Sequence, residues 1–141
     1  MATTSNFFDF PAIRGFGLDL QQLKAVQKAL ALFDKTGKYQ NLYAASGALA
    51  VTAGFDVITK TGSLAAMTLA APTAAQNGMQ KTVTSTTAFA HTITATGLFD
   101  NGVTGGSKNT ATFAAFPGAS ITIQAINGKW NVIALNAVTV A

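Results

Sequence analysis

The feature that most constrains the fold is the residue pattern of 38–141, which consists of short runs rich in Thr, Val, Ile and Ala. Gly, Asn and Pro separate these runs. Short β-prone runs bounded by turn formers are typical of strands. So many short strands in one region predict a mainly β protein, with residues 38–141 forming a jelly-roll-like β-sandwich. The candidate strands are 39–45, 48–60, 66–71, 79–86, 90–96, 110–116, 120–126 and 129–139.

Two local patterns in this region make sharper predictions. The pair Asn127-Gly128 lies between two β-prone runs, and a type I′ turn needs residues that accept positive φ at both central positions. We therefore expect a hairpin between 120–126 and 129–136. In residues 90–96 the alternation of side chains places His91 on the same face as Ile93 and Ala95, with threonines on the other face.

Residues 18–37 carry the pattern of an amphipathic helix. Asp19 and Gln22 are spaced as a capping box, and Gly37 is placed to end the helix. The apolar positions recur three and four residues apart, as one stripe of a helix requires: Leu20, Leu23, Val26, Leu30 and Phe33. Lys24, Lys28 and Lys35 fall on another face, which is either a solvated face or a surface that docks on an acidic partner.

Residues 1–17 hold four phenylalanines around Pro11, with neither a helical nor a strand period. The segment is too apolar to favour water and too irregular to form an element of its own. We expect an extended arm that docks on a partner, and the alternative is that it folds back on its own domain. The chain thus divides into an arm (1–17), a helix (18–37) and a β-domain (38–141).

The composition argues against an enzyme. The chain has no Cys, one His and five Asp without Glu, and charged residues make up 10%. These residues supply no disulfide, no thiolate nucleophile and no common zinc site. His91 is the single candidate base, yet no Gly-x-Ser-x-Gly motif accompanies it. The segment Gly102–Lys108 differs from the phosphate-loop pattern, because the residue before its Lys is Ser rather than Gly. We expect no catalytic residue, no cofactor and no metal ion.

The remaining composition predicts the class of partner. The net charge of +4 arises from few acids rather than from clustered bases, so we expect no direct contact with nucleic acid. No uninterrupted apolar stretch is long enough to span a membrane, and Arg14, the first basic residue, follows an aromatic segment. We therefore expect no membrane partner and synthesis in the cytoplasm of a cell.

Several short motifs resemble tailed-bacteriophage capsid decoration, cement or head-fibre proteins over roughly residues 48–136. They are Val57–Lys60, Leu69–Ala74, Asn77-Gly78, Ser85–Ile93 and Asn127–Val132. The resemblance implies a small β module on the outer face of a virion capsid, bound to the major capsid protein and to its own copies as a dimer or trimer. It does not cover the arm or the helix.

These observations together predict a non-enzymatic structural protein that cements neighbouring capsid subunits. The expected capsid-interface residues are the apolar residues of the arm and two lysines of the helix: Phe7, Phe8, Phe10, Ile13, Phe16, Lys24 and Lys28. One alternative is a virion β-domain that binds host glycans through Trp130 and the 100–109 loop. Another is an enzyme with an unfamiliar site built from Asp residues and His91.

Overall fold

The computed structural model describes residues 19–36 and 40–141. The chain divides into two compact units, residues 1–38 and residues 39–141. In the first unit the structure describes one helix, α2 (Leu20–Thr36). The second unit is a β-domain, and it contains all the strands given below.

Helix α2 begins at the predicted cap. The Asp19 carboxylate accepts a hydrogen bond from the Gln22 backbone N–H at 2.8 Å, and the Gln22 side-chain oxygen accepts one from the Asp19 N–H at 3.0 Å. This reciprocal pair satisfies N–H groups that have no partner inside the first turn of a helix. The predicted capping box is therefore confirmed, whereas the predicted stop at Gly37 lies outside the described residues.

The β-domain contains ten strands and one short 3-10 turn, which confirms the predicted mainly β fold, and α2 is the one α-helix among the described residues. In chain order the elements are β1 (Gln40–Tyr43), β2 (Gly47–Ala48), β3 (Gly54–Ile58), β4 (Ala66–Thr68), η2 (Ala74–Gln76), β5 (Gln80–Ser85), β6 (Thr92–Asp100), β7 (Lys108–Phe113), β8 (Ser120–Ile126), β9 (Lys129–Asn136) and β10 (Val138–Val140).

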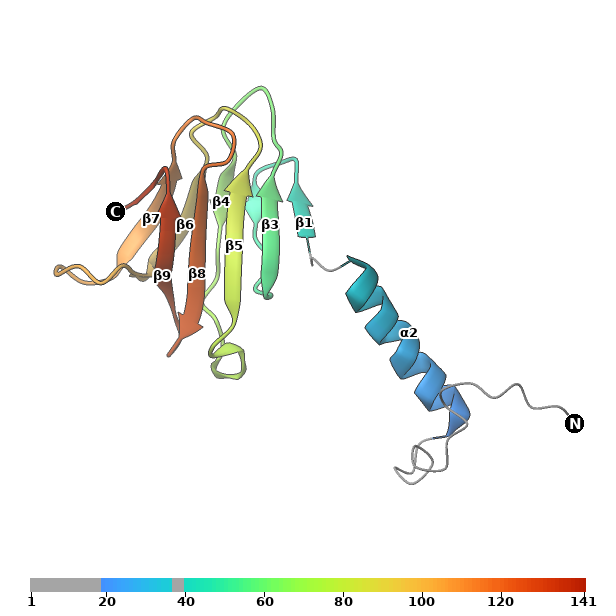
Figure 1. The fold of residues 1–141 in the computed structure, drawn as a ribbon. Coiled ribbons are helices and arrows are strands. Elements are labelled where there is room, and N and C mark those ends of the chain that lie inside the picture. Colours follow the sequence, from blue (N-terminus) through green and yellow to red (C-terminus); the bar gives the residue numbers. More distant parts are fainter. Residues whose placement is uncertain (1–18, 37–39) are drawn as a thin grey trace, which may run out of the picture. The chain divides into compact units, whose positions relative to one another are not determined.

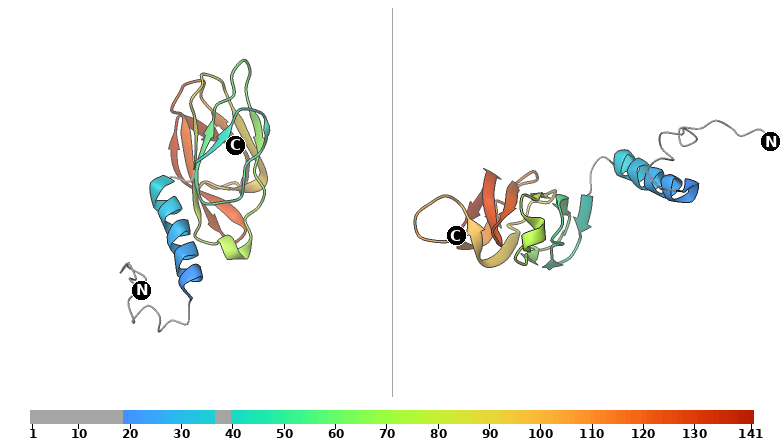
Figure 2. Two further views of the ribbon diagram at one scale, coloured as in Figure 1. Left: turned by 90° about the vertical axis from the view of Figure 1, so that its right-hand side faces the viewer. Right: turned by 90° about the horizontal axis from the view of Figure 1, so that it is seen from below.

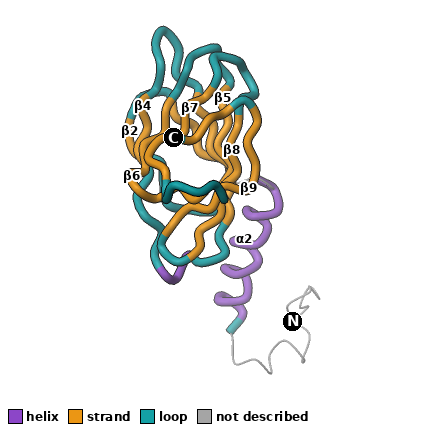
Figure 3. The backbone as a smooth tube through the Cα atoms, turned by 90° about the vertical axis from the view of Figure 1, so that its left-hand side faces the viewer, coloured by secondary structure: helices purple, strands orange, loops and turns teal. Residues whose placement is uncertain are grey.

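The ten strands form a continuous hydrogen-bonded set that folds into a sandwich. One layer has the order β1-β3-β5-β8-β9, and the other has the order β2-β4-β6-β7-β10. The view along the domain in Figure 3 has β2, β4 and β6 on one side and β5, β8 and β9 on the other. Strand β6 joins the layers, because its far end pairs with β9 after a bulge between Thr94 and Phe99. A strand that changes sheets through a bulge is a common way to close a sandwich.

The connections differ from those of a jelly roll. From β1 to β6 the chain alternates between the two layers, so that β1, β3 and β5 pair in parallel, and so do β2, β4 and β6. Jelly rolls are built from antiparallel Greek keys. The β-sandwich is therefore confirmed, but its jelly-roll connection is not. The first half of the domain winds as a β-solenoid does, and the last four strands close it with antiparallel pairs.

The core lies between the two layers. Its largest fully buried apolar side chains are Trp130, Phe99 and Phe113. The Trp130 indole N–H donates to the Ala70 carbonyl at 2.9 Å, so its one polar atom is satisfied inside the core. Strand β8 alternates as expected, since Ile121, Ile123 and Ala125 are buried while the residues between them are not.

The predicted hairpin turn is confirmed. Asn127 and Gly128 join β8 to β9 and have φ values of 51° and 76°. The turn is tied to the segment after η2, because the Asn127 N–H donates to the Asn77 side-chain oxygen at 2.9 Å. Both turns lie at the same end of the β-domain (Figure 2).

Two isoleucines near the hairpin allow a matched test of the core. Ile123 is fully buried, whereas Ile133 is 53% exposed. We expect Ile123→Ala to lower the free energy of unfolding by about 2–5 kcal/mol, because it removes buried methyl groups and leaves a cavity. Ile133→Ala should change it by about 0.5 kcal/mol or less. Urea denaturation of both variants measures the difference, and equal losses would contradict this location of the core.

Candidate interaction surfaces

The residues predicted to bind a capsid fall into two groups. Phe7, Phe8, Phe10, Ile13 and Phe16 lie outside the described residues. Lys24 and Lys28 lie one turn apart on α2, and both are exposed. Leu20 and Val26 of the same helix are also exposed, whereas Leu23 is buried. The helix therefore offers two ammonium groups and two apolar side chains to a partner.

The β-domain offers unpaired strand edges. Within the described residues, β1 pairs only with β3, β2 only with β4, and β10 only with β7. The backbone groups on the free side of such strands can pair with another chain. Strand β1 lies at the edge of its layer (Figure 1), and its Leu42 is 65% exposed.

The outer face of the β1-β3-β5-β8-β9 layer combines apolar and hydroxyl side chains. By register, Leu42 of β1 and Phe55 of β3 lie on this face, and Phe55 is 39% exposed. Further along the layer the hydroxyl groups of Thr82 and Thr122 are hydrogen-bonded at 3.0 Å. This face carries few charges, so it can be covered by a partner at a low desolvation cost.

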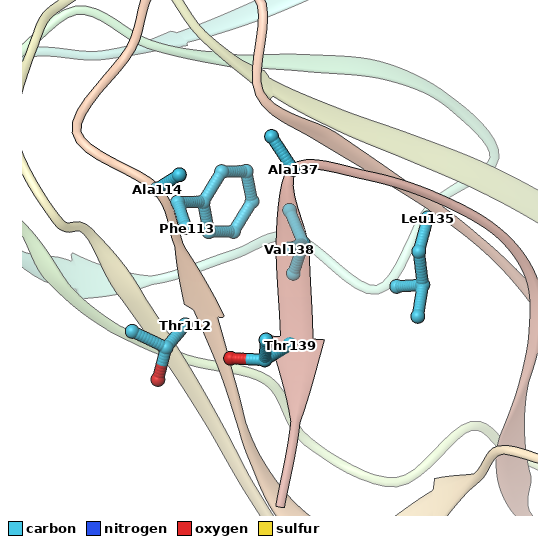
Figure 4. Close-up of a pocket in the computed structure, with 7 residues that line it drawn as sticks. All are labelled: Thr112, Phe113, Ala114, Leu135, Ala137, Val138 and Thr139. Atoms are coloured by element: carbon cyan, nitrogen blue, oxygen red, sulfur yellow. The ribbon is translucent and has the colours of Figure 1, made fainter.

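A shallow apolar pocket of about 360 Å³ opens beside β7 and β10. Figure 4 shows Phe113 and Val138, which are register partners, next to each other in it. All of its lining residues are uncharged: Thr112, Phe113, Ala114, Leu135, Ala137, Val138 and Thr139. The pocket can hold an apolar group, but it contains no acid, base or nucleophile apart from two threonine hydroxyls.

His91 is buried and holds two loops together. Its Nδ1 accepts a hydrogen bond from the Ala65 N–H at 2.8 Å, and its Nε2 lies 2.7 Å from the Thr87 hydroxyl oxygen. That hydroxyl donates to the Lys60 carbonyl at 2.9 Å, so it accepts the proton of Nε2. Burial lowers the pKa of His91, and the nearby Lys60 ammonium lowers it further. The imidazole is thus a neutral structural group with both nitrogens engaged.

The loop proposed for glycan binding is held by polar contacts. Ser107 donates to the Asp100 carboxylate at 2.6 Å and accepts from the Lys129 ammonium at 2.5 Å. The serine hydroxyl therefore points its proton at a carboxylate rather than at a base, which does not favour a nucleophilic serine. Trp130, the other residue of that alternative, is fully buried and has no face free for a sugar.

A buried polar cluster that the sequence pattern did not predict lies beneath β1, β3 and β5. The Lys81 ammonium contacts the Asp56 carboxylate at 2.5 Å, and both side chains are 0% exposed. The Asn41 side-chain N–H donates to the other Asp56 oxygen at 2.8 Å. Burial raises the pKa of the neighbouring Tyr43, and the Asp56 carboxylate raises it further. The strand period was the available signal, because Lys81 alternates in phase with the buried Val83 and Ser85.

Comparison with known proteins adds no assignment, since no protein-family model matches the chain and no curated protein matches it. Among residues 19–36 and 40–141, no three of the His, Asp and Glu side chains are grouped so that they could hold a metal ion. In the same residues, no helix has both the length and the apolar character needed to cross a lipid bilayer.

The depressed pKa of His91 predicts a pH-dependent stability. As the pH falls through about 6.5, the unfolded chain binds a proton that the folded chain does not bind, so the folded state loses stability. We expect the free energy of unfolding to fall with a slope of at most about 1.4 kcal/mol per pH unit, the limit for one proton.

Urea titrations between about pH 8 and pH 5 measure this slope. In the variant His91→Gln the side chain cannot be protonated, and its free energy of unfolding should stay nearly constant over the same range. Parallel pH curves for the two proteins would contradict the role given to His91.

Proposed function

We propose that the chain is a structural virion protein that binds the outer surface of a tailed-phage capsid and cements neighbouring major capsid subunits. The observation that carries the proposal is the division of the chain. The core cluster is drawn from residues 49–138 of the β-domain, while α2 leaves Lys24, Lys28, Leu20 and Val26 exposed for another surface. The partner in this proposal follows from the resemblance of short motifs in the β-domain to tailed-phage decoration proteins.

The proposed mechanism is mechanical. Aromatic residues of the arm bind apolar pockets of the shell, where each buried ring removes apolar surface from water. Lys24 and Lys28 steer the helix to acidic capsid residues and contribute little at high salt. A copy that contacts two capsid subunits must be released before they separate, so the free energy of separation rises with each bound copy.

The same proposal includes association between copies. The free edges of β1, β2 and β10 can each accept a strand from a second copy by β-augmentation. The exposed Leu42 beside the β1 edge adds apolar area to such a contact. We propose a dimer or a trimer on the capsid.

The two alternatives have no specific observation in their favour. Glycan binding relied on Trp130, whose side chain is fully buried, and on a loop whose Ser107 is engaged with Asp100 and Lys129. An enzyme relied on His91, whose two ring nitrogens already have partners.

Deletion of residues 2–17 tests the anchor. We expect the truncated chain to keep the circular-dichroism spectrum and urea midpoint of its β-domain, because the described core cluster is built from residues 49–138. We also expect it to lose binding to shells assembled from the major capsid protein encoded with this chain, as measured by co-sedimentation. Undiminished occupancy of the shells would contradict the anchor.

Charge variants test the helix separately from the arm. The double variant Lys24→Gln/Lys28→Gln should bind the same shells with an affinity reduced about threefold to thirtyfold at low salt, and less at high salt. The matched control is Lys108→Gln/Lys129→Gln, which removes the same charge from the β-domain. Equal losses in the two double variants would show a general charge effect and contradict a role for the helix.

A further inference from the structure

The Asp56 carboxylate links an amine and a carboxamide inside the β-domain. Its Oδ2 accepts from Lys81 Nζ at 2.5 Å, and its Oδ1 accepts from Asn41 Nδ2 at 2.8 Å. Lys81 and Asp56 are both fully buried. Lysine and aspartate are almost never fully buried unless they are paired, so this cluster calls for a chemical explanation.

The register of the sheet explains how the three side chains meet. Strand β3 lies between β1 and β5 (Figure 1), and Asn41 of β1 is the register partner of Asp56. The register partner of Lys81 is Gly54, so Asp56 is its diagonal neighbour. Because Gly54 has no side chain, the long stem of Lys81 can cross β3 on its inner face toward the Asp56–Asn41 pair.

Asp56 is placed to act as the base that frees the Lys81 amine for reaction. An ammonium group has three N–H donors, but Asp56 Oδ2 is its one hydrogen-bond acceptor among the described residues. A buried ion pair also carries a large desolvation cost. Transfer of one proton from Nζ to Oδ2 removes both charges and leaves a lone pair on Nζ. An amine with a free lone pair is a nucleophile.

We propose that Lys81 and Asn41 become joined by an intramolecular isopeptide bond after the domain folds, with Asp56 as the group that transfers protons. In the first step Asp56 takes a proton from the Lys81 ammonium, the freed amine attacks Asn41 Cγ, and the electron pair of the C=O bond moves onto Asn41 Oδ1. In the second step Asp56 delivers that proton to Asn41 Nδ2 and takes the next proton from Nζ. The C=O bond then re-forms as the Cγ–Nδ2 bond breaks, and the leaving ammonia takes the proton of Asp56 and departs as ammonium.

The balance of this reaction is complete with the groups present. One ammonium group and one primary amide give one secondary amide and one ammonium ion, and Asp56 ends as the carboxylate with which it began. No oxidant, cofactor or metal ion is needed. The geometry suits Asp56 to this task, because it already touches both the attacking nitrogen and the leaving nitrogen.

A bond between Lys81 and Asp56 itself is less well supported. In that reaction the leaving group is the hydroxyl of Asp56, which needs a proton from a second acid. No second carboxyl group contacts the cluster in the described part of the chain. The raised pKa of Tyr43 makes its hydroxyl a poor substitute. Asn41 thus remains the better electrophile.

The bond would fix a short strand at the edge of its layer. Strand β1 has four residues and a single neighbour, and it follows the helix-containing unit in the chain. A covalent tie from Asn41 to Lys81 in β5 would hold β1 in place when the preceding segment is pulled. This inference does not depend on the identity of the partner of the arm.

The mass of the purified full chain tests the proposal. Under denaturing conditions we expect it to be lower than the sequence mass by one ammonia, about 17 Da. An unchanged sequence mass overturns the proposal. A loss of about 18 Da, one water, also overturns it, because that result assigns the bond to Asp56.

Trypsin mapping locates the bond. Residues 39–60 form one tryptic peptide that contains both Asn41 and Asp56, and an amide on Lys81 blocks cleavage after it. We expect peptide 39–60 to be joined to peptide 61–108, with fragment ions that place the link on Asn41. Separate peptides 39–60 and 61–81 as the main products overturn the proposal.

Variants assign the roles of the three residues. Lys81→Arg, Asn41→Ala and Asp56→Ala should each restore the sequence mass, whereas the matched control Lys60→Arg should keep the loss of ammonia. If Asp56→Ala folds and still loses ammonia, the assigned role of Asp56 is wrong. Should any of these variants fail to fold, the mass and peptide map of the unaltered chain still decide whether the bond exists.

Discussion

The exclusion of water from the space between the two layers is the constraint on which the rest of this structure depends. Trp130, Phe99 and Phe113 fill that space together with the inner faces of β5, β6 and β8. One residue in ten of this chain is charged, so few charged side chains are available for its surface. The outer faces and strand edges are therefore rich in Thr and apolar groups, and a partner can cover such surfaces.

Burial also decides the chemistry of the polar residues. His91 is neutral because burial lowers its pKa and both of its ring nitrogens have hydrogen-bond partners. Asp56 and Lys81 are also buried, but there one carboxylate accepts hydrogen bonds from both an amine and an amide. The first arrangement fixes loops, whereas the second brings reactive groups together. A single physical condition therefore produces a structural site and a candidate reaction site in one small domain.

The sequence predicts features that depend on near neighbours in the chain. The Asp19–Gln22 cap and the Asn127-Gly128 turn are set within four residues. The parallel pairing of β1, β3 and β5 is different, because strand order is decided by contacts between distant segments. The Asn41–Asp56–Lys81 cluster depends on that pairing. Residues 41, 56 and 81 give no local sign that they meet, apart from the inward phase of Lys81.

The proposed function has a mechanical consequence beyond occupancy of the shell. A protein that bridges capsid subunits must raise the resistance of the assembled particle to rupture, whatever its symmetry position. The most direct measurement is the temperature at which capsids release their contents, recorded by calorimetry with and without saturating amounts of the full chain. The account predicts a higher rupture temperature for the saturated capsids. An identical rupture temperature at full occupancy would contradict it.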